Sequence, residues 1–339
     1  MTTPIDNLDP VELTEFARLA LQDFDAQSQS LARFLPYSEV ADIRYAYNKG
    51  IDTLVDQATY RAFDAESPIG RRPGSQRVTG ELLPISRKIP LSEYAQLRLR
   101  NAPNDEVVQG VFRDGGRLAR GIAARLELAR GELLVTGKVV LNENGASMTY
   151  DAGRHASLTV SALTSTAKWS DHSASTPISN VLAWKALVKA RVGIEPNRLV
   201  VSSTVMAHLQ QNTEVRGFAQ AVANAPARVT VEAVQAAFAG LANVTVEVYE
   251  TPFGMTDDPI PTHKVVLLRD NIPLGSTAYG IPLEAQEPEY AALAPQAGVV
   301  AGAWKEKDPI AVWTHAVGIS LPLLAVPDAT LSCQVIDAP

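Results

Sequence analysis

Two short stretches carry residue types that could perform chemistry. Residues 131–138, GELLVTGK, place a lysine behind two glycines, as a phosphate-binding loop does. That loop needs four residues between its glycines and a Ser or Thr after the lysine, whereas here five residues intervene and Val139 follows. Ser170, Asp171 and His172 are the residue types of a catalytic triad, but adjacent positions rarely bring three side chains to one point. Neither pattern therefore supports a catalytic site.

Residues that commonly bind metals or cofactors are scattered along the chain. The histidines are His155, His172, His208, His263 and His315. No two of them have the spacing of a metal site. Asp257 and Asp258 stand before Pro259, which favours a solvated turn over a cation site. The glycine-rich, nucleophile-elbow and zinc-binding motifs of the common enzyme classes are absent from the sequence. We therefore expect no catalytic residue, no cofactor and no metal.

Composition restricts the function classes further. The chain has 339 residues, 46% hydrophobic and 20% charged, with a net charge of −7. That charge is not typical of nucleic-acid binders, which are usually basic. A single cysteine, Cys333, excludes an intramolecular disulfide and fits a reducing compartment. No apolar run has the length of a membrane helix, and the first residues lack the apolar core of a signal peptide.

One long helix dominates the expected architecture, from Asn104 to Leu134. Its apolar residues recur at steps of three and four, and its length predicts a rod of about 45 Å. Arginines are expected on its other faces, at Arg113, Arg117, Arg120, Arg125 and Arg130. Glycines within it cost about 1 kcal/mol each relative to alanine and favour a bend. The bend candidates are Gly110, Gly115, Gly116 and Gly121.

Oppositely charged segments precede this helix. Residues 1–30 are acidic and predict a short amphipathic helix from Pro10. Their carboxylates are Asp6, Asp9, Glu12, Glu15, Asp23 and Asp25. Residues 61–90 are rich in turn residues and basic, with Arg61, Arg71, Arg72, Arg77, Arg87 and Lys88. A turn at 73–74 predicts extended flanks over Tyr60–Arg72 and Ser75–Pro90, as a disordered loop or as a hairpin that lies on a partner.

Strands and a separate module are expected after the helix. The run Leu133–Leu141 is apolar and β-branched, and the turn at 144–145 predicts a hairpin. Residues 173–302 alternate helices with strands, which indicates an inserted α/β module. We expect the final strand, Ala329–Ile336, to rejoin the sheet beside the long helix.

Several segments in order resemble the major capsid proteins of tailed bacteriophages, specifically the lambda-type capsid protein E family. They are LLPISRKIP, ARGELLVTGKVVL, MTYDAG, WSDHSASTPISNVLAW, RLVVSSTVMAHL, VVLLRDNIPLGSTAYG and KDPIAVWTHAVGISLPLLAVPDATLSCQV. The resemblance covers about residues 35–336 and implies an α+β fold, the Johnson or Hong Kong 97-type capsid fold. It implies an N-terminal arm (1–47), an extended loop (48–96), a peripheral domain (97–172 and 303–339) and an axial domain (173–302).

The resemblance also implies a function and partners. We expect a structural protein that self-assembles as hexamers and pentamers into an icosahedral head shell around double-stranded DNA, without sequence-specific DNA binding. No long charged helix precedes the arm, so we expect a separate scaffolding protein, along with a portal and a decoration protein. The expected location is the virion capsid, assembled in the host bacterial cytoplasm, with no membrane contact. Two alternatives stay open: an encapsulin-like nanocompartment shell, and an α/β enzyme with residues 173–302 as its catalytic domain.

A hypothesis about assembly follows from the charges. Arm carboxylates meet hairpin arginines between subunits, with exposed pairs worth about 0–1 kcal/mol each. Such pairs would fix the relative position of neighbouring subunits more than they would strengthen their binding. Each subunit would be held by its neighbours at several sites at once. We further expect the long helix to bend at its glycines and to straighten as the shell expands.

Overall fold

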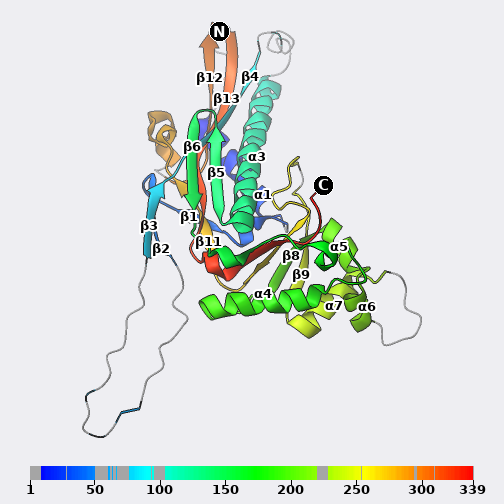
Figure 1. Cartoon of the computed structure of the whole chain (residues 1–339). Helices are drawn as coiled ribbons and strands as arrows, with labels where there is room; N and C mark the ends of the chain where they lie inside the picture. Colours follow the sequence, from blue (N-terminus) through cyan, green and yellow to red (C-terminus); the bar gives the residue numbers. More distant parts are fainter. Residues whose placement is uncertain are drawn as a thin grey trace.

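A long helix and two five-stranded sheets form the framework of this computed structural model (Figure 1). The structure describes residues 9–27, 29–49, 60–61, 63, 66, 76–92, 94, 104–219, 228–252, 254–293, 296–308 and 310–338. The α-helices are α1 (Pro10–Asp25), α3 (Asn104–Thr136), α4 (Pro177–Val192), α5 (Ser203–Leu209), α6 (Thr213–Ala219) and α7 (Val231–Ala242). Short 3-10 helices are η2 (Leu31–Arg33), η3 (Ala156–Leu158), η4 (Ser165–Ala167), η5 (Leu283–Gln286), η6 (Pro288–Leu293) and η7 (Pro327–Ala329).

The strands follow the chain in order. They are β1 (Tyr37–Glu39), β2 (Arg44–Lys49), β3 (Gln76–Glu81), β4 (Pro84–Leu91), β5 (Lys138–Glu143), β6 (Ala146–Asp151), β7 (Thr159–Val160), β8 (Arg198–Ser202), β9 (Thr245–Tyr249), β10 (Lys264–Leu268), β11 (Gly275–Gly280), β12 (Val300–Lys307), β13 (Ile310–Leu324) and β14 (Thr330–Gln334). One sheet has the order β1-β11-β13-β12 with β4 also paired to β13, and the other has the order β7-β14-β10-β8-β9.

The helix α3 confirms the predicted long helix and continues two residues beyond its predicted end, through Thr136. Gly137 ends it in the left-handed region with φ 77°, and its N–H donates to the carbonyl of Leu133 at 2.8 Å. The prediction of a strand from Leu133 is therefore wrong for its first residues, because helical hydrogen bonding continues until a glycine allows the chain to turn. The strand β5 begins only at Lys138.

The helix α1 begins where the sequence predicts, because the Asp9 side chain accepts a hydrogen bond from the Val11 N–H at 2.9 Å. Its apolar side packs against α3, with Leu13 and Ala17 fully buried. Phe16 stays 42% exposed, although its ring packs edge-on against Phe112 of α3. The helix is thus fixed to its own subunit and is not a free arm.

The strand β13 organises the first sheet. It pairs antiparallel with β12, β4 and β11 along its length, and Trp304 and Trp313 are cross-strand partners.

The strand β3 pairs with β2 in a register that joins Lys49 to Gln76. The predicted pairing of the flanks Tyr60–Arg72 and Ser75–Pro90 is therefore wrong, since the paired residues are 44–49 and 76–81. Most of the first flank lies outside the described residues.

The hairpin β5–β6 confirms the predicted turn. Asn144 and Gly145 have φ angles of 48° and 85°, as the tightest antiparallel turns require at both central positions. After this hairpin, η3 occupies residues 156–158, and β7 holds only Thr159 and Val160.

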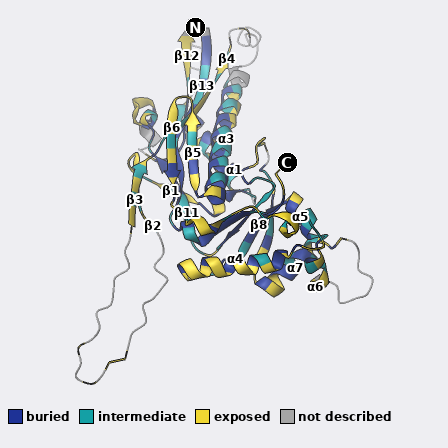
Figure 2. Cartoon of the chain, in the orientation of Figure 1, coloured by how far each residue is buried: buried dark blue, intermediate teal, exposed yellow. Residues whose placement is uncertain are grey.

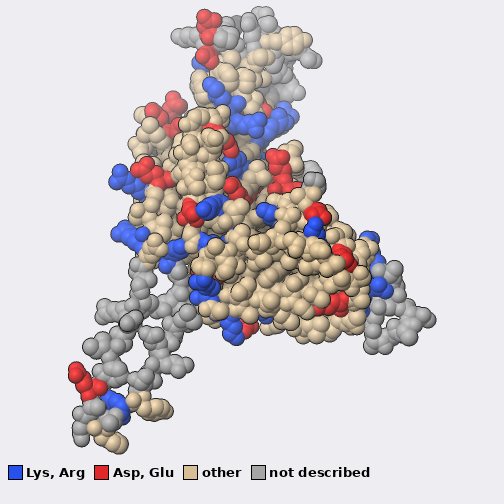
Figure 3. Space-filling view, in the orientation of Figure 1, with Lys and Arg blue, Asp and Glu red and all other residues tan. Residues whose placement is uncertain are grey.

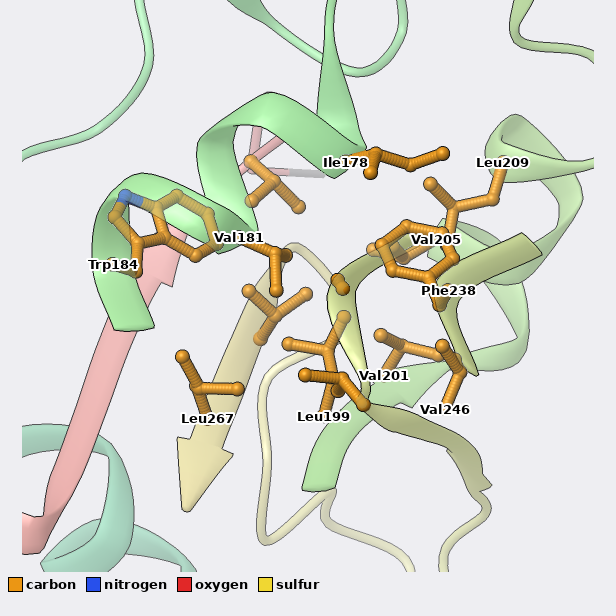
Figure 4. Packing of buried hydrophobic residues seen from close by; sticks show 14 of the residues in the cluster. Ile178, Val181, Trp184, Leu199, Val201, Val205, Leu209, Phe238, Val246 and Leu267 are labelled. Carbon is orange, nitrogen blue, oxygen red and sulfur yellow. The ribbon is translucent and has the colours of Figure 1, made fainter. Parts of the chain in front are cut away.

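The second sheet separates two hydrophobic cores. Alternate residues of its strands face opposite sides, so Leu199 and Val201 join the core beneath the helices, while Val200 faces the end of α3. Figure 4 shows Trp184 and Phe238 of the covering helices in one cluster with Leu199 and Leu267 of the strands. Figure 2 shows these strands buried and α4 exposed on its outer side. Each such large apolar side chain contributes about 1.5–3 kcal/mol on burial.

The last strand corrects one expectation. The strand β14 pairs antiparallel with β10 and parallel with β7, so it lies in the same sheet as β8 and β9. The expectation that it rejoins the sheet beside the long helix holds only for its pairing with β7, because β5 and β6 form a separate two-stranded sheet. Leu331 and Cys333 point into the core under the helices, where their apolar surface is buried. Conversely, β11 and β12 begin within residues 173–302 but pair with β13.

Candidate functional site

The residues with catalytic potential do not converge. Asp171 accepts hydrogen bonds from the Ser173 hydroxyl and two following N–H groups, while His172 Nε2 lies 2.9 Å from Nδ1 of His208. Gly131 lies inside α3, where an added Cβ would come within 2.2 Å of the carbonyl oxygen of Pro259. That glycine allows a loop to touch the helix and does not cradle a phosphate.

The tryptophan side chains are engaged in packing. Trp169 and Trp184 stack with ring centroids 5.9 Å apart in the core beneath the helices. Lys88 Nζ lies 4.3 Å from the ring centroid of Trp313 and 5.9 Å from that of Trp304. Within the described residues, no group of three or more His, Cys, Asp or Glu side chains could hold a metal ion. None of the helices in the described part has the length and apolar character needed to cross a membrane.

A buried ion network joins the segments that meet on α3. Arg130 Nη1 donates to Asp25 Oδ1 at 2.6 Å and to Glu127 Oε2 at 3.2 Å. The side chains of Arg130 and Glu127 are 1% and 0% exposed. Burial lowers the pKa of Arg130, but hydrogen bonding and charge from Asp25 outweigh it and raise that pKa overall. Arg130 was expected on an exposed face and is instead the centre of this network.

The Glu127 carboxylate accepts hydrogen bonds from two other parts of the chain. It accepts the Leu31 N–H at 2.7 Å, the Ser30 hydroxyl at 3.2 Å and the Tyr249 hydroxyl at 3.2 Å. Burial raises the pKa of Glu127, while Arg130 and these donors oppose that rise. The network therefore ties the residues after α1, the strand β9 and the helix α3 together.

Sequence reasoning missed this network, although a signal was present. Arg130 stands four residues after Leu126 and three before Leu133, and both leucines are buried on α3. A charged residue at that spacing belongs to the apolar stripe and needs a buried partner. Glu127 at the i−3 position is that partner.

The end of α3 is held by another arginine that the sequence did not reveal. Arg154 Nη1 donates to the Leu134 carbonyl at 2.8 Å, and its Nη2 donates to the Val135 carbonyl at 2.5 Å. The same side chain reaches Thr330 and Ser332 of β14. Burial lowers the pKa of Arg154 to about 10. The helix end and the last strand are thus fastened by one guanidinium.

The acidic residues of the predicted arm have three different environments. Asp9 caps α1, and Asp25 is engaged by Arg130 in its own subunit, which removes it from the intersubunit candidates. Glu12, Glu15 and Asp23 are exposed on α1. Asp6 lies outside the described residues.

The basic candidates of the predicted hairpin are also separated. Arg77 is exposed on β3, Arg87 and Lys88 are exposed on β4, and Arg61 is exposed in the segment between β2 and β3. Arg71 and Arg72 lie outside the described residues. Among the described residues, no ion pair within the subunit joins the acidic arm residues to Arg77, Arg87 or Lys88.

The helix α3 runs unbroken through the glycines predicted to bend it. An added Cβ at Gly115 would lie 2.8 Å from a methyl group of Leu13, and at Gly116 it would lie 2.9 Å from the ring of Phe16. These two glycines therefore let α1 approach closely. A Cβ at Gly110 would meet nothing within 4 Å, and Gly121 faces only Arg87 at 4.0 Å.

Comparison with known families decides what kind of protein has this architecture. The family model for phage major capsid protein E matches residues 44–335. The chain belongs to the phage major capsid protein E family. This family consists of structural shell proteins, so the relevant sites are the surfaces and joints described above. No curated protein sequence matches the chain.

Solved structures support the capsid fold. The putative capsid protein of a prophage of E. coli CFT073 is 17% identical with a TM-score of 0.63, and the match covers 95% of this chain and 98% of that one. A phage-related protein from Bordetella bronchiseptica RB50 is 13% identical with a TM-score of 0.58, covering 95% and 97%. A chain of the satellite phage P4 procapsid is 9% identical with a TM-score of 0.52, covering 95% and 91%. The capsid protein E chain therefore has the Hong Kong 97-type fold expected from its sequence.

Proposed function

We propose that many copies of this major capsid protein close as hexamers and pentamers into the icosahedral head shell of a tailed phage, around its double-stranded DNA. The family match over residues 44–335 is the observation that carries this proposal. The long helix, the paired sheets and the protruding β2–β3 strands supply a rigid subunit with segments that reach its neighbours (Figure 1).

We assign the parts of the subunit by analogy with that fold. Residues 1–47 are the arm, 48–96 the extended loop and 97–172 the peripheral domain with α3 as its spine. Residues 173–302 are the axial domain, and 303–339 return to the peripheral domain. Sheet pairing refines this scheme, because β11 and β12 join the peripheral sheet and β14 joins the axial sheet.

Several partners complete the proposal. A separate scaffolding protein, a portal and a decoration protein would act with the shell, which assembles in the host bacterial cytoplasm. The net charge of −7 suits a container for DNA, because a basic wall would bind phosphates tightly and oppose release. Packaged DNA is therefore held without sequence-specific contacts.

The spine also takes part in maturation in this proposal. Interior glycines lower the cost of bending, so α3 bends in the precursor shell and straightens on expansion. Structures of the shell before and after expansion test this point. A straight, unbroken α3 in both states would remove it.

Electron microscopy of the purified full-length protein tests the shell function. We expect large icosahedral shells. Small uniform shells around a specific cargo protein would instead support the nanocompartment alternative, and isolated globules under all assembly conditions would contradict both.

Charge reversal on the extended loop tests its role. R71E/R72E should fold like the wild type but fail to form normal shells, because arm carboxylates would meet like charges. R71K/R72K keeps both charges and is the matched control, which we expect to assemble. Normal shells from R71E/R72E would refute the contact.

A further inference from the structure

An arginine-lined pocket lies where α1, α3 and β4 meet. It has a volume of about 540 Å³, and its lining includes Arg87, Arg117, Arg120 and Asp23. Figure 3 shows Lys and Arg side chains gathered along the upper part of α3. Three guanidinium groups and one carboxylate give this pocket a net positive charge.

These three arginines lie together in one pocket without a partner among the described residues, whereas Arg77 and Arg113, which also lack one there, do not line the pocket. No ion pair or hydrogen bond joins the side chain of Arg87, Arg117 or Arg120 to any described residue, Asp23 included. By contrast, the next arginine along α3, Arg125, binds Glu143 at 2.7 Å. Like charges collected in one hollow repel each other, and a bound anion relieves that repulsion. Arginine is also the side chain best suited to bind carboxylates.

We propose that this pocket binds the carboxylates of Glu12 and Glu15 from a second copy of the chain. Both are exposed on α1, three residues apart and thus on one face, and neither side chain has an ion pair or hydrogen bond among the described residues. Beside them, Phe16 and Leu19 are 42% and 57% exposed, so the same contact would also bury apolar surface.

The acidic partner has to come from another subunit. The Asp25–Arg130 pair and the packing of α1 on α3 fix this helix in its own subunit. Within the described part of the subunit, no ion pair joins Glu12 or Glu15 to Arg87, Arg117 or Arg120, so these carboxylates do not fill the pocket of their own subunit. Identical copies that join unlike surfaces in this way form closed rings when the rotation between them closes.

This inference rests on the proposed shell function and adds a specific contact to it. Its test uses R117E/R120E of the full-length protein, with R113E as the control. Arg113 is exposed on the same helix but does not line the pocket. We expect circular dichroism and thermal melting of all variants to match the wild type. The shell fraction of R117E/R120E, measured by sedimentation and microscopy, should fall about tenfold or more, because each lost contact is repeated around the ring. R113E should assemble normally.

A reciprocal exchange identifies the partner. E12R/E15R should lose shells as R117E/R120E does, and the quadruple variant should regain them to within about threefold, as coupled charges do in a double-mutant cycle. Normal shells from R117E/R120E would overturn the site while leaving the shell function intact. A folded quadruple variant without shells would overturn the assignment to Glu12 and Glu15. Failure of the wild type to form shells would instead count against the shell function itself.

Discussion

The hydroxyl of Tyr249 donates a hydrogen bond to the Glu127 carboxylate at 3.2 Å, and this contact joins strand β9 to helix α3. Tyr249 belongs to the sheet covered by α4 to α7, whereas Glu127 belongs to the spine. Arg130 places a positive charge on the other oxygen of the same carboxylate. A capsid subunit that moves as one piece needs such a joint, and here it is a buried, hydrogen-bonded charge cluster.

Removing Glu127 should therefore destabilise the whole subunit. E127A leaves Asp25 as the one carboxylate that pairs with Arg130 among the described residues, and it leaves the Leu31 N–H and the Tyr249 hydroxyl without this acceptor. We expect the free energy of unfolding to fall by about 3 kcal/mol, as for other broken buried ion pairs. Urea denaturation followed by circular dichroism measures it.

Two companion variants calibrate that result. E143A removes a pair with Arg125 at the surface and should cost less than about 1 kcal/mol. Y249F removes one hydrogen bond and should cost about 1 kcal/mol. Equal losses from E127A and E143A would show that the buried network adds nothing to stability.

Two glycines of α3 should respond oppositely to alanine. At Gly131 a Cβ would lie 2.2 Å from the backbone oxygen of Pro259, so G131A must displace the main chain and should destabilise by about 1–3 kcal/mol. At Gly110 nothing lies within 4 Å, so G110A should stabilise by about 1 kcal/mol through helix propensity. Thermal melting compares the two, and stabilisation by G131A would disprove the close contact.

Substitution of Arg154 should lower the free energy of unfolding more than substitution of an exposed basic residue does. R154A removes the donor to the Leu134 carbonyl and the link to β14, which we expect to cost about 2 kcal/mol in unfolding free energy. The control is K138A, whose exposed pair with Asp151 should be worth less than about 1 kcal/mol. Chemical denaturation of both variants tests the difference, and a similar cost for both would argue against a capping role.

Stability should depend on pH through the paired histidines. Burial, then the charge of His172, lowers the pKa of His208 in the folded chain. Below about pH 6.5 the unfolded chain gains that proton first, so the free energy of unfolding falls with decreasing pH, by at most about 1.4 kcal/mol per pH unit. The stabilising effect is complete above that pH and is lost as pH falls through the folded pKa.

The variant H208Q isolates this contribution. Urea unfolding at pH 7.5 and at pH 5.5 should show a smaller loss of stability for H208Q than for the wild type, because glutamine takes up no proton. His263 and His315, whose pKa values burial also lowers, are present in both proteins and cancel in the comparison. An unchanged pH dependence would exclude His208 as its source.

Local signals in the sequence located most elements correctly. The apolar periodicity of 104–134 predicted α3, Asp9 and Pro10 predicted the start of α1, and the turn at 144–145 predicted a hairpin. These three predictions are correct because apolar periodicity, helix caps and positive-φ turns depend on residues that are neighbours in the sequence. The order of several weak motifs also indicated the family, which the match over residues 44–335 confirms.

The pairing of strands that lie far apart in the chain was harder to predict from the sequence. The last strand, β14, was expected in the sheet beside the long helix but lies between β10 and β7, and β3 pairs with β2 and not with the preceding flank. A short apolar strand fits several sheets equally well in sequence. Only the fit of Leu331 and Cys333 into one particular core selects its partner.

The sequence by itself determined the spine, the capped helices, the tight hairpin and the capsid family, because these depend on short-range pattern and motif order. The tertiary structure alone decided that Arg130 is buried against Asp25 and Glu127, and that Arg87 shares a pocket with Arg117 and Arg120. A charged side chain looks the same in sequence whether solvent or a partner faces it. Its environment depends on chain segments distant in the sequence, and only folding brings them together.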